Sequence, residues 1–113
     1  LYEEYQESLD IAQNHKDDNI IYVVDNDFTF LNAMPEFLIY KKHLIIDINE
    51  NDLEQINALK EVSQDNEAIL CIKNWLDTEK IKDDILNNTD FTKAELISNV
   101  SGDVLSTYYK LTK

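Results

Sequence analysis

The chain has 113 residues, which is enough for one domain with a single core and too few for two. It carries 23 acidic and 10 basic side chains, for a formal net charge of −13. This charge argues against direct binding to nucleic acid or to an anionic membrane surface and favours a neutral or basic protein partner. The single cysteine, Cys71, lies in an apolar run, so no internal disulfide is possible and we expect a reduced intracellular setting.

The N-terminal part predicts a helix followed by a buried strand. Residues 1–15 form an amphipathic pattern in which Leu1, Tyr5 and Leu9 share one helical face. The chain starts at Leu1 inside this expected helix, which predicts a domain of a longer protein. The run IIYVV at 20–24 is continuously apolar and β-branched, which is typical of a strand buried on both faces of a parallel sheet.

A bent helix and a second strand are expected next. Asp27 can cap a short helix, and Pro35 can open a new helical turn but cannot lie deep inside one. We therefore expect a two-part helix over 28–41. The run HLIIDI at 43–48 predicts the second buried strand.

The rest of the chain predicts a third strand among helices. Amphipathic patterns indicate helices over 49–62 and 74–88, on either side of the buried strand AILCI at 68–72. A helix cap is plausible at the start of 89–100. The tail 104–112 fits a strand or a helix, because its β-branched and aromatic residues also fall on one helical face, and we favour the helix.

Buried strands alternating with amphipathic helices predict an α/β fold with a small parallel sheet of three to four strands flanked by helices. We expect residues 1–113 to form a single domain. Its parts would be an N-terminal helix at 1–15, an α/β core at 20–88 and a C-terminal extension at 89–113.

The segment AILCIKNWLDTEKIKDD, residues 68–84, leads from an apolar strand into a Trp-Leu pair that opens a helix. It resembles the last strand and helix of a BRCT domain, a protein-interaction module of DNA-repair and chromatin proteins. With a helix in front, the layout also resembles the helix-preceded BRCT domains of silent-information-regulator scaffolds. The resemblance implies a non-catalytic module of a larger nuclear scaffold in chromatin silencing. We expect Trp75 to be a large core aromatic.

The resemblance also bears on the ligand. BRCT domains that bind phosphopeptides need a Ser or Thr after the first strand, where this chain has Asp25, and a carboxylate repels phosphate. Short unphosphorylated peptides are therefore the expected ligands. Exposed aromatics could line the groove, and our candidates are Tyr2, Tyr5, Phe28 and Tyr40. Taken alone, each of these aromatics is better explained as a core or helix-packing contact.

Carboxylates gather at the predicted strand ends. Asp25 and Asp27 follow the first strand and Asp47 ends the second, so all three could hold Mg²⁺ at one edge of the sheet. The set resembles the receiver domain of bacterial response regulators, with Asp25 and Asp27 as the acidic pair, Asp47 as phosphoacceptor and Lys73 as the lysine. A degenerate receiver-like signalling domain is thus one alternative. The more economical interpretation is that Asp27 caps a helix and no metal is bound.

Other chemistry finds little support. The chain has one Gly, no Gly-rich phosphate loop and no G-x-S-x-G or HExxH motif. His15 and His43 lack Cys or His partners at zinc-site spacing, and Cys71 should be buried and inert. We predict no enzyme activity and no cofactor. A second alternative is an acidic inhibitor that mimics nucleic acid with carboxylates spaced like phosphates.

Overall fold

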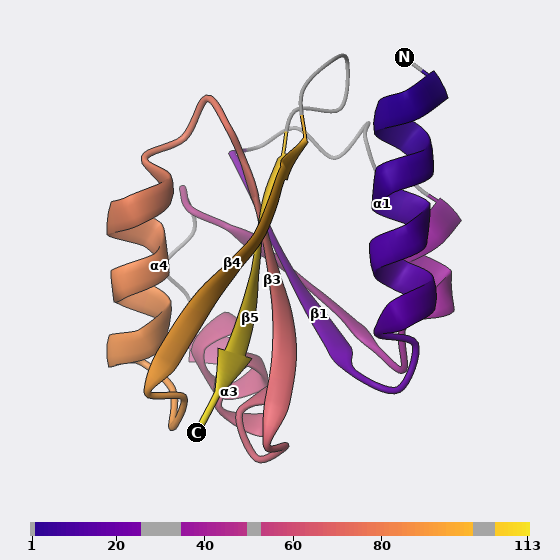
Figure 1. Cartoon of the computed structure of the whole chain (residues 1–113). Helices are drawn as coiled ribbons and strands as arrows, with labels where there is room; N and C mark the ends of the chain where they lie inside the picture. The colour runs from indigo at the N-terminus through magenta and orange to yellow at the C-terminus, as the bar shows by residue number, and fades with distance from the viewer. Residues whose placement is uncertain (1, 26–34, 50–52, 101–105) are drawn as a thin grey trace.

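A mixed β-sheet forms the centre of the molecule (Figure 1). The computed structural model describes residues 2–25, 35–49, 53–100 and 106–113, without the side chains of 2–5, 35, 53, 54 and 56. Within them, five strands follow the order β2-β1-β3-β5-β4. They are β1 (Asn19–Val24), β2 (His43–Asp47), β3 (Glu67–Lys73), β4 (Lys93–Val100) and β5 (Ser106–Thr112). Strands β2, β1 and β3 are parallel, whereas β5 runs antiparallel to β3 and to β4.

Helices cover both faces of the sheet (Figure 1). They are α1 (Tyr2–Asn14), the 3-10 helix η1 (Pro35–Ile39), α3 (Leu53–Val62) and α4 (Thr78–Asn87). One apolar cluster joins α1 and η1 to the sheet, and a second joins α3 and α4 to the opposite face. The predicted α/β class and the N-terminal helix are therefore confirmed.

Strand β1 is apolar along its whole length after its first residue because helices cover both of its faces. Ile20, Tyr22 and Val24 pack under α1 and η1, while Ile21 and Val23 face α3 and α4. Each of these side chains is buried. The prediction that this strand is buried on both faces is confirmed.

The C-terminal extension corrects three predictions. It forms the antiparallel hairpin of β4 and β5 in place of helices, so the expectations of a wholly parallel sheet and of a helical tail are wrong. The described residues form five strands, where three to four were expected. Strand β5 lies between β3 and β4, which buries Tyr108 on one face and Tyr109 and Leu111 on the other. The aromatic and β-branched residues of β5 suit a strand that is covered on both faces. Because the same residues also fit one face of a helix, the sequence pattern did not distinguish the two.

The predicted helical turn at Pro35 is confirmed, since Pro35 opens η1. The helix expected over 74–88 begins only at Thr78, because residues 74–76 form a turn. Asp77 caps α4, because its Oδ1 accepts the backbone N–H of Lys80 at 3.2 Å. The helix expected over 28–34 lies outside the described residues. None of the helices in the described ranges is long and apolar enough to cross a membrane.

Candidate binding surface at the carboxyl edge of the sheet

The three parallel strands end side by side. Val24 pairs with Asp47, and Val23 pairs with Ile72, so the ends of β1, β2 and β3 lie at one edge, which we call the carboxyl edge. Parallel sheets of α/β proteins bind ligands at this edge. The prediction that the ends of the first three strands meet at one edge is confirmed.

Lys73, the last residue of β3, is fully buried at this edge. Its Nζ donates to Ser106 Oγ at 3.3 Å and lies 5.2 Å from the centre of the Tyr22 ring. It also lies 5.7 Å from the centre of the Trp75 ring. Burying an ammonium group is costly unless hydrogen bonds and nearby charge or π-density compensate it. The carboxyl edge therefore holds a buried positive charge against two aromatic rings.

Trp75 lies in the turn between β3 and α4 and is 48% exposed, so the prediction of a core tryptophan is wrong. The reason is the tight turn after Lys73, in which Leu76 N–H donates to the Lys73 carbonyl at 3.0 Å. Asn74 fixes the turn against β4, because its Nδ2 donates to the Val100 carbonyl at 3.1 Å. The indole Nε1 donates to both carboxylate oxygens of Asp25, at 3.2 and 3.3 Å.

Two buried carboxylates accompany this cluster. Glu36 on η1 is 2% exposed, and burial raises its pKa above the usual 4.5, partly offset by a hydrogen bond to its own backbone and by the charge of Lys73. Asp47 is equally buried, and its Oδ1 accepts the backbone N–H of Asn49 at 2.9 Å. Among the described residues, Glu36 Oε2 and Asp47 Oδ2 have no hydrogen-bond partner. Nothing in the sequence singled out Glu36, because an acid after Pro35 fits a solvated first helical turn equally well.

The predicted magnesium pocket is not assembled by the described residues. Asp27 lies outside them, and Asp25 accepts the indole N–H of Trp75. Across 2–25, 35–49, 53–100 and 106–113, no group of three or more His, Cys, Asp or Glu side chains could hold a metal ion.

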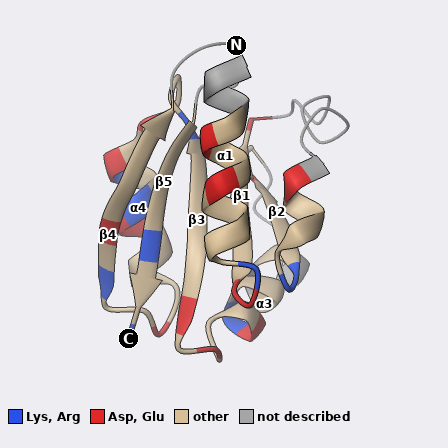
Figure 2. Ribbon diagram, turned by 45° about the vertical axis from the view of Figure 1, so that its right-hand side comes forward, with Lys and Arg blue, Asp and Glu red and all other residues tan. Residues whose placement is uncertain are grey.

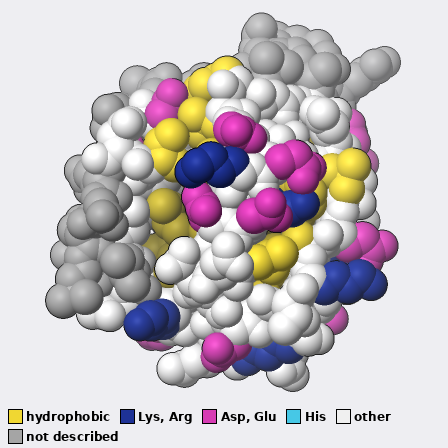
Figure 3. Space-filling view, turned by 90° about the vertical axis from the view of Figure 1, so that its left-hand side faces the viewer, with side chains coloured by type: hydrophobic (Ala, Val, Ile, Leu, Met, Phe, Trp, Pro, Cys, Tyr) yellow, Lys and Arg dark blue, Asp and Glu magenta, His cyan; other side chains and the backbone are white. Residues whose placement is uncertain are grey.

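A pocket of about 360 Å³, which we call the α4 pocket, opens beside the carboxyl edge. Its apolar lining comes from Val23 and Ile46 on the strands and from Ile81 and Ile85 on α4. Figure 3, which views the side that carries α4, shows apolar side chains among acidic and basic ones on this face. A pocket of this size accepts a side chain or a small ligand.

The rim of the α4 pocket is mainly acidic. Asp77 and Asp84 line it together with Lys80. Lys80 Nζ lies 3.1 Å from Asp84 Oδ2, but both side chains are more than half exposed, and such pairs are weak. A ligand that carries a cationic group can therefore compete for these carboxylates.

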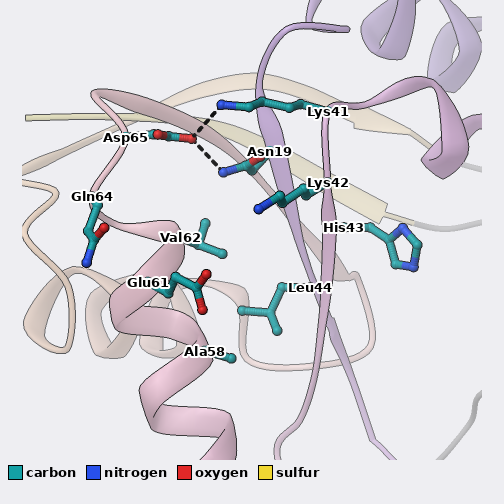
Figure 4. Close-up of a pocket in the computed structure, with 10 residues that line it drawn as sticks. All are labelled: Asn19, Lys41, Lys42, His43, Leu44, Ala58, Glu61, Val62, Gln64 and Asp65. Atoms are coloured by element: carbon teal, nitrogen blue, oxygen red, sulfur yellow. Dashed lines mark hydrogen bonds and ion pairs between the residues drawn. The ribbon is translucent and has the colours of Figure 1, made fainter.

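A second pocket, of about 280 Å³, lies at the opposite, amino edge, where β1 and β2 begin (Figure 4). Figure 4 shows Asp65 next to Lys41 and Asn19, above the apolar Leu44 and Val62. Asp65 Oδ2 accepts from Asn19 Nδ2 at 2.7 Å and lies 3.6 Å from Lys41 Nζ. The Asp65 carboxylate is thus already paired, while among the described residues Asn19 Oδ1 is buried without a hydrogen-bond partner. Because its carboxylate is paired, we treat the amino edge as the weaker candidate for ligand binding.

The predicted partner-binding aromatics do not form a groove among the described side chains. Tyr40 is 5% exposed, so its expected exposure is wrong. Tyr40 directly follows η1, three positions after Phe37, and both side chains pack into the core. Burial raises the pKa of the Tyr40 hydroxyl well above its usual 10.0. Tyr2 and Tyr5 lie on α1 without described side chains, and Phe28 lies outside the described residues.

The carboxyl edge thus combines a half-exposed indole, the 45% exposed Ile48 and an apolar pocket with an acidic rim. Chemically, this arrangement suits a group that is both apolar and cationic. Comparison of the chain with known protein families, with curated proteins and with solved structures finds no match.

Proposed function

We propose that this domain is a non-catalytic interaction module that binds a short, unphosphorylated, basic segment of a partner protein at the carboxyl edge. The observation that carries the proposal is the α4 pocket, whose apolar floor and acidic rim belong to a chain of net charge −13. An apolar side chain of the partner fills the pocket. Its Lys or Arg neighbours approach Asp77 and Asp84.

The two parts of the surface contribute differently. Burial of one apolar side chain stabilises a complex by about 1.5–3 kcal/mol. Each exposed ion pair at the rim adds less than about 1 kcal/mol but speeds association and selects the sign of the partner's charge. We therefore expect apolar anchoring to set the affinity and the rim to set the specificity.

The BRCT resemblance supports the same proposal, since it implies a peptide-binding module of a larger nuclear scaffold. The order β2-β1-β3 behind α1 is compatible with that layout. The exposed Trp75 and the antiparallel hairpin of β4 and β5 do not fit it. A nucleic-acid mimic needs carboxylates in phosphate-like rows on one face. Figure 2 shows acidic residues on several helices and strands, and the peptide titrations below separate a mimic from an interaction module.

The test is calorimetric titration of the domain with basic peptides that differ only in one central residue, Leu or Ser. The Leu peptide should bind more tightly, and its binding should survive 0.3 M salt. Lys80→Glu makes the rim more acidic and should tighten binding roughly three- to tenfold at low salt. Lys16→Glu is the matched control, because it makes the same charge change at the exposed turn after α1.

Three outcomes would overturn the proposal. The first is that neither peptide binds at millimolar concentration. The second is that Lys80→Glu and Lys16→Glu change the affinity equally, which would indicate attraction to net charge alone. The third is that Leu and Ser peptides bind equally and both lose binding steeply with salt, which is the behaviour expected of an acidic mimic.

A further inference from the structure

Trp75 is presented at the carboxyl edge in a fixed orientation. Its indole N–H is held by Asp25, and the Lys73 ammonium lies 5.7 Å from its ring centre. Nearly half of its surface nevertheless remains exposed. Large aromatic side chains that are both held and exposed are the side chains on which binding energy concentrates in protein interfaces.

The surroundings of this ring favour a cation. The face of an indole ring attracts cations more strongly than any other aromatic side chain. The Asp25 carboxylate beside it can accept about four hydrogen bonds, more than the indole N–H uses. The buried charge of Lys73 opposes a second cation here, while Asp25 and the net charge of −13 favour it.

Among cationic side chains, arginine fits this pair best. A guanidinium group is planar, stacks on an aromatic ring and donates from a rigid fork that matches a carboxylate. A lysine ammonium has no plane to stack and meets the carboxylate as a point charge. Asp77, on the rim of the α4 pocket, follows Trp75 by two positions, so one short segment can reach both.

We infer that Trp75 and Asp25 form the docking point for an arginine of the basic segment, whose guanidinium stacks on the indole and pairs with the carboxylate. The inference rests on the proposed function and names the side chain that gives the site its specificity. A neighbouring apolar residue of the same segment enters the α4 pocket.

The chain has one tryptophan, so its fluorescence reports from this ring alone. The whole domain is titrated with the Leu-containing basic peptide in three forms that carry arginine, lysine or citrulline at one position. The arginine form should shift the emission of Trp75 and bind roughly three- to tenfold more tightly than the citrulline form. Asp25→Asn keeps an acceptor for the indole N–H and should abolish most of this preference.

Asp17→Asn is the matched control, because it removes one exposed charge at the amino edge and should leave the preference unchanged. Equal affinities for the three peptides, or an unchanged preference in Asp25→Asn, would overturn the inference. If Asp25→Asn fails to fold, the affinities of the three peptides for the wild-type domain still test the inference. If the Lys80→Glu effect persists without any arginine preference, the inference fails while the proposed function stands.

Discussion

The two edges of the parallel strands differ in how deeply their charged side chains are buried. At the amino edge, the Asp65 carboxylate pairs near solvent with Asn19 Nδ2 and with the exposed Lys41. At the carboxyl edge, Lys73 and Glu36 are almost completely buried. Buried charges are expensive and often mark functional sites, whereas solvated pairs contribute little. The carboxyl edge, which we propose binds the partner, thus buries costly charge, whereas the amino edge keeps its charged pair near solvent.

The substitution expected to change stability most is Lys73→Ala, at the carboxyl edge. The substitution leaves a cavity beside Tyr22 and removes the hydrogen bond to Ser106, so the free energy of unfolding should fall by about 3 kcal/mol. Equilibrium unfolding in urea measures this loss. Lys73→Met keeps the length of the side chain without its charge and should lose less than half as much. A loss below about 1 kcal/mol for Lys73→Ala would mean that the buried ammonium is not integral to the edge.

Part of this edge could be predicted from the sequence. Continuous β-branched runs identify β1, β2 and β3, and the parallel arrangement then brings Asp47 and Lys73 to the same edge. These inferences need only local composition and the geometry of a parallel sheet. An Asp before Thr78 is a typical local cap signal for α4, although the amphipathic pattern placed the start of this helix at residue 74.

The features that could not be predicted depend on contacts between segments far apart in the sequence. Strand β5 is a strand because it fits between β3 and β4, and its own residues also suit a helix. Trp75 is exposed because the turn after Lys73 is pinned to β4 through Asn74. Glu36 is buried because η1 packs over β1, which no local pattern reveals.

An intermediate effect is expected at the amino edge from Asp65→Ala. It leaves Nδ2 of the buried Asn19 without its acceptor, which should lower the free energy of unfolding by about 1–2 kcal/mol in the same urea experiment. Asp65→Asn keeps an oxygen acceptor and loses only the exposed pair with Lys41, so it should be nearly neutral. If Asp65→Ala destabilised as much as Lys73→Ala, the proposed difference between the edges would disappear.

The smallest expected effect is the pH dependence of Glu36→Gln. Burial raises the pKa of Glu36 above the usual 4.5 in the folded state. Below about pH 4.5 the carboxyl is protonated whether the chain is folded or unfolded, and it contributes no penalty. As the pH rises to the elevated pKa, the unfolded chain ionises first, so this group lowers the stability of the wild type.

Glu36→Gln removes that loss, so the stability of the variant relative to the wild type should increase between pH 4.5 and the raised pKa and then level off. The charge of Lys73 lowers the pKa of Glu36 and so offsets part of the effect of burial. Tyr40 and Cys71 stay protonated over this pH range, because burial raises their pKa values, that of Cys71 to about 11. Urea midpoints measured from pH 4 to pH 8 give the difference curve. Glu95→Gln makes the same chemical change at an exposed position of β4 and serves as the control. A Glu36→Gln curve parallel to that of the wild type would show that the Glu36 carboxyl is not held in a costly environment, and the contrast between the two edges would then rest on Lys73 alone.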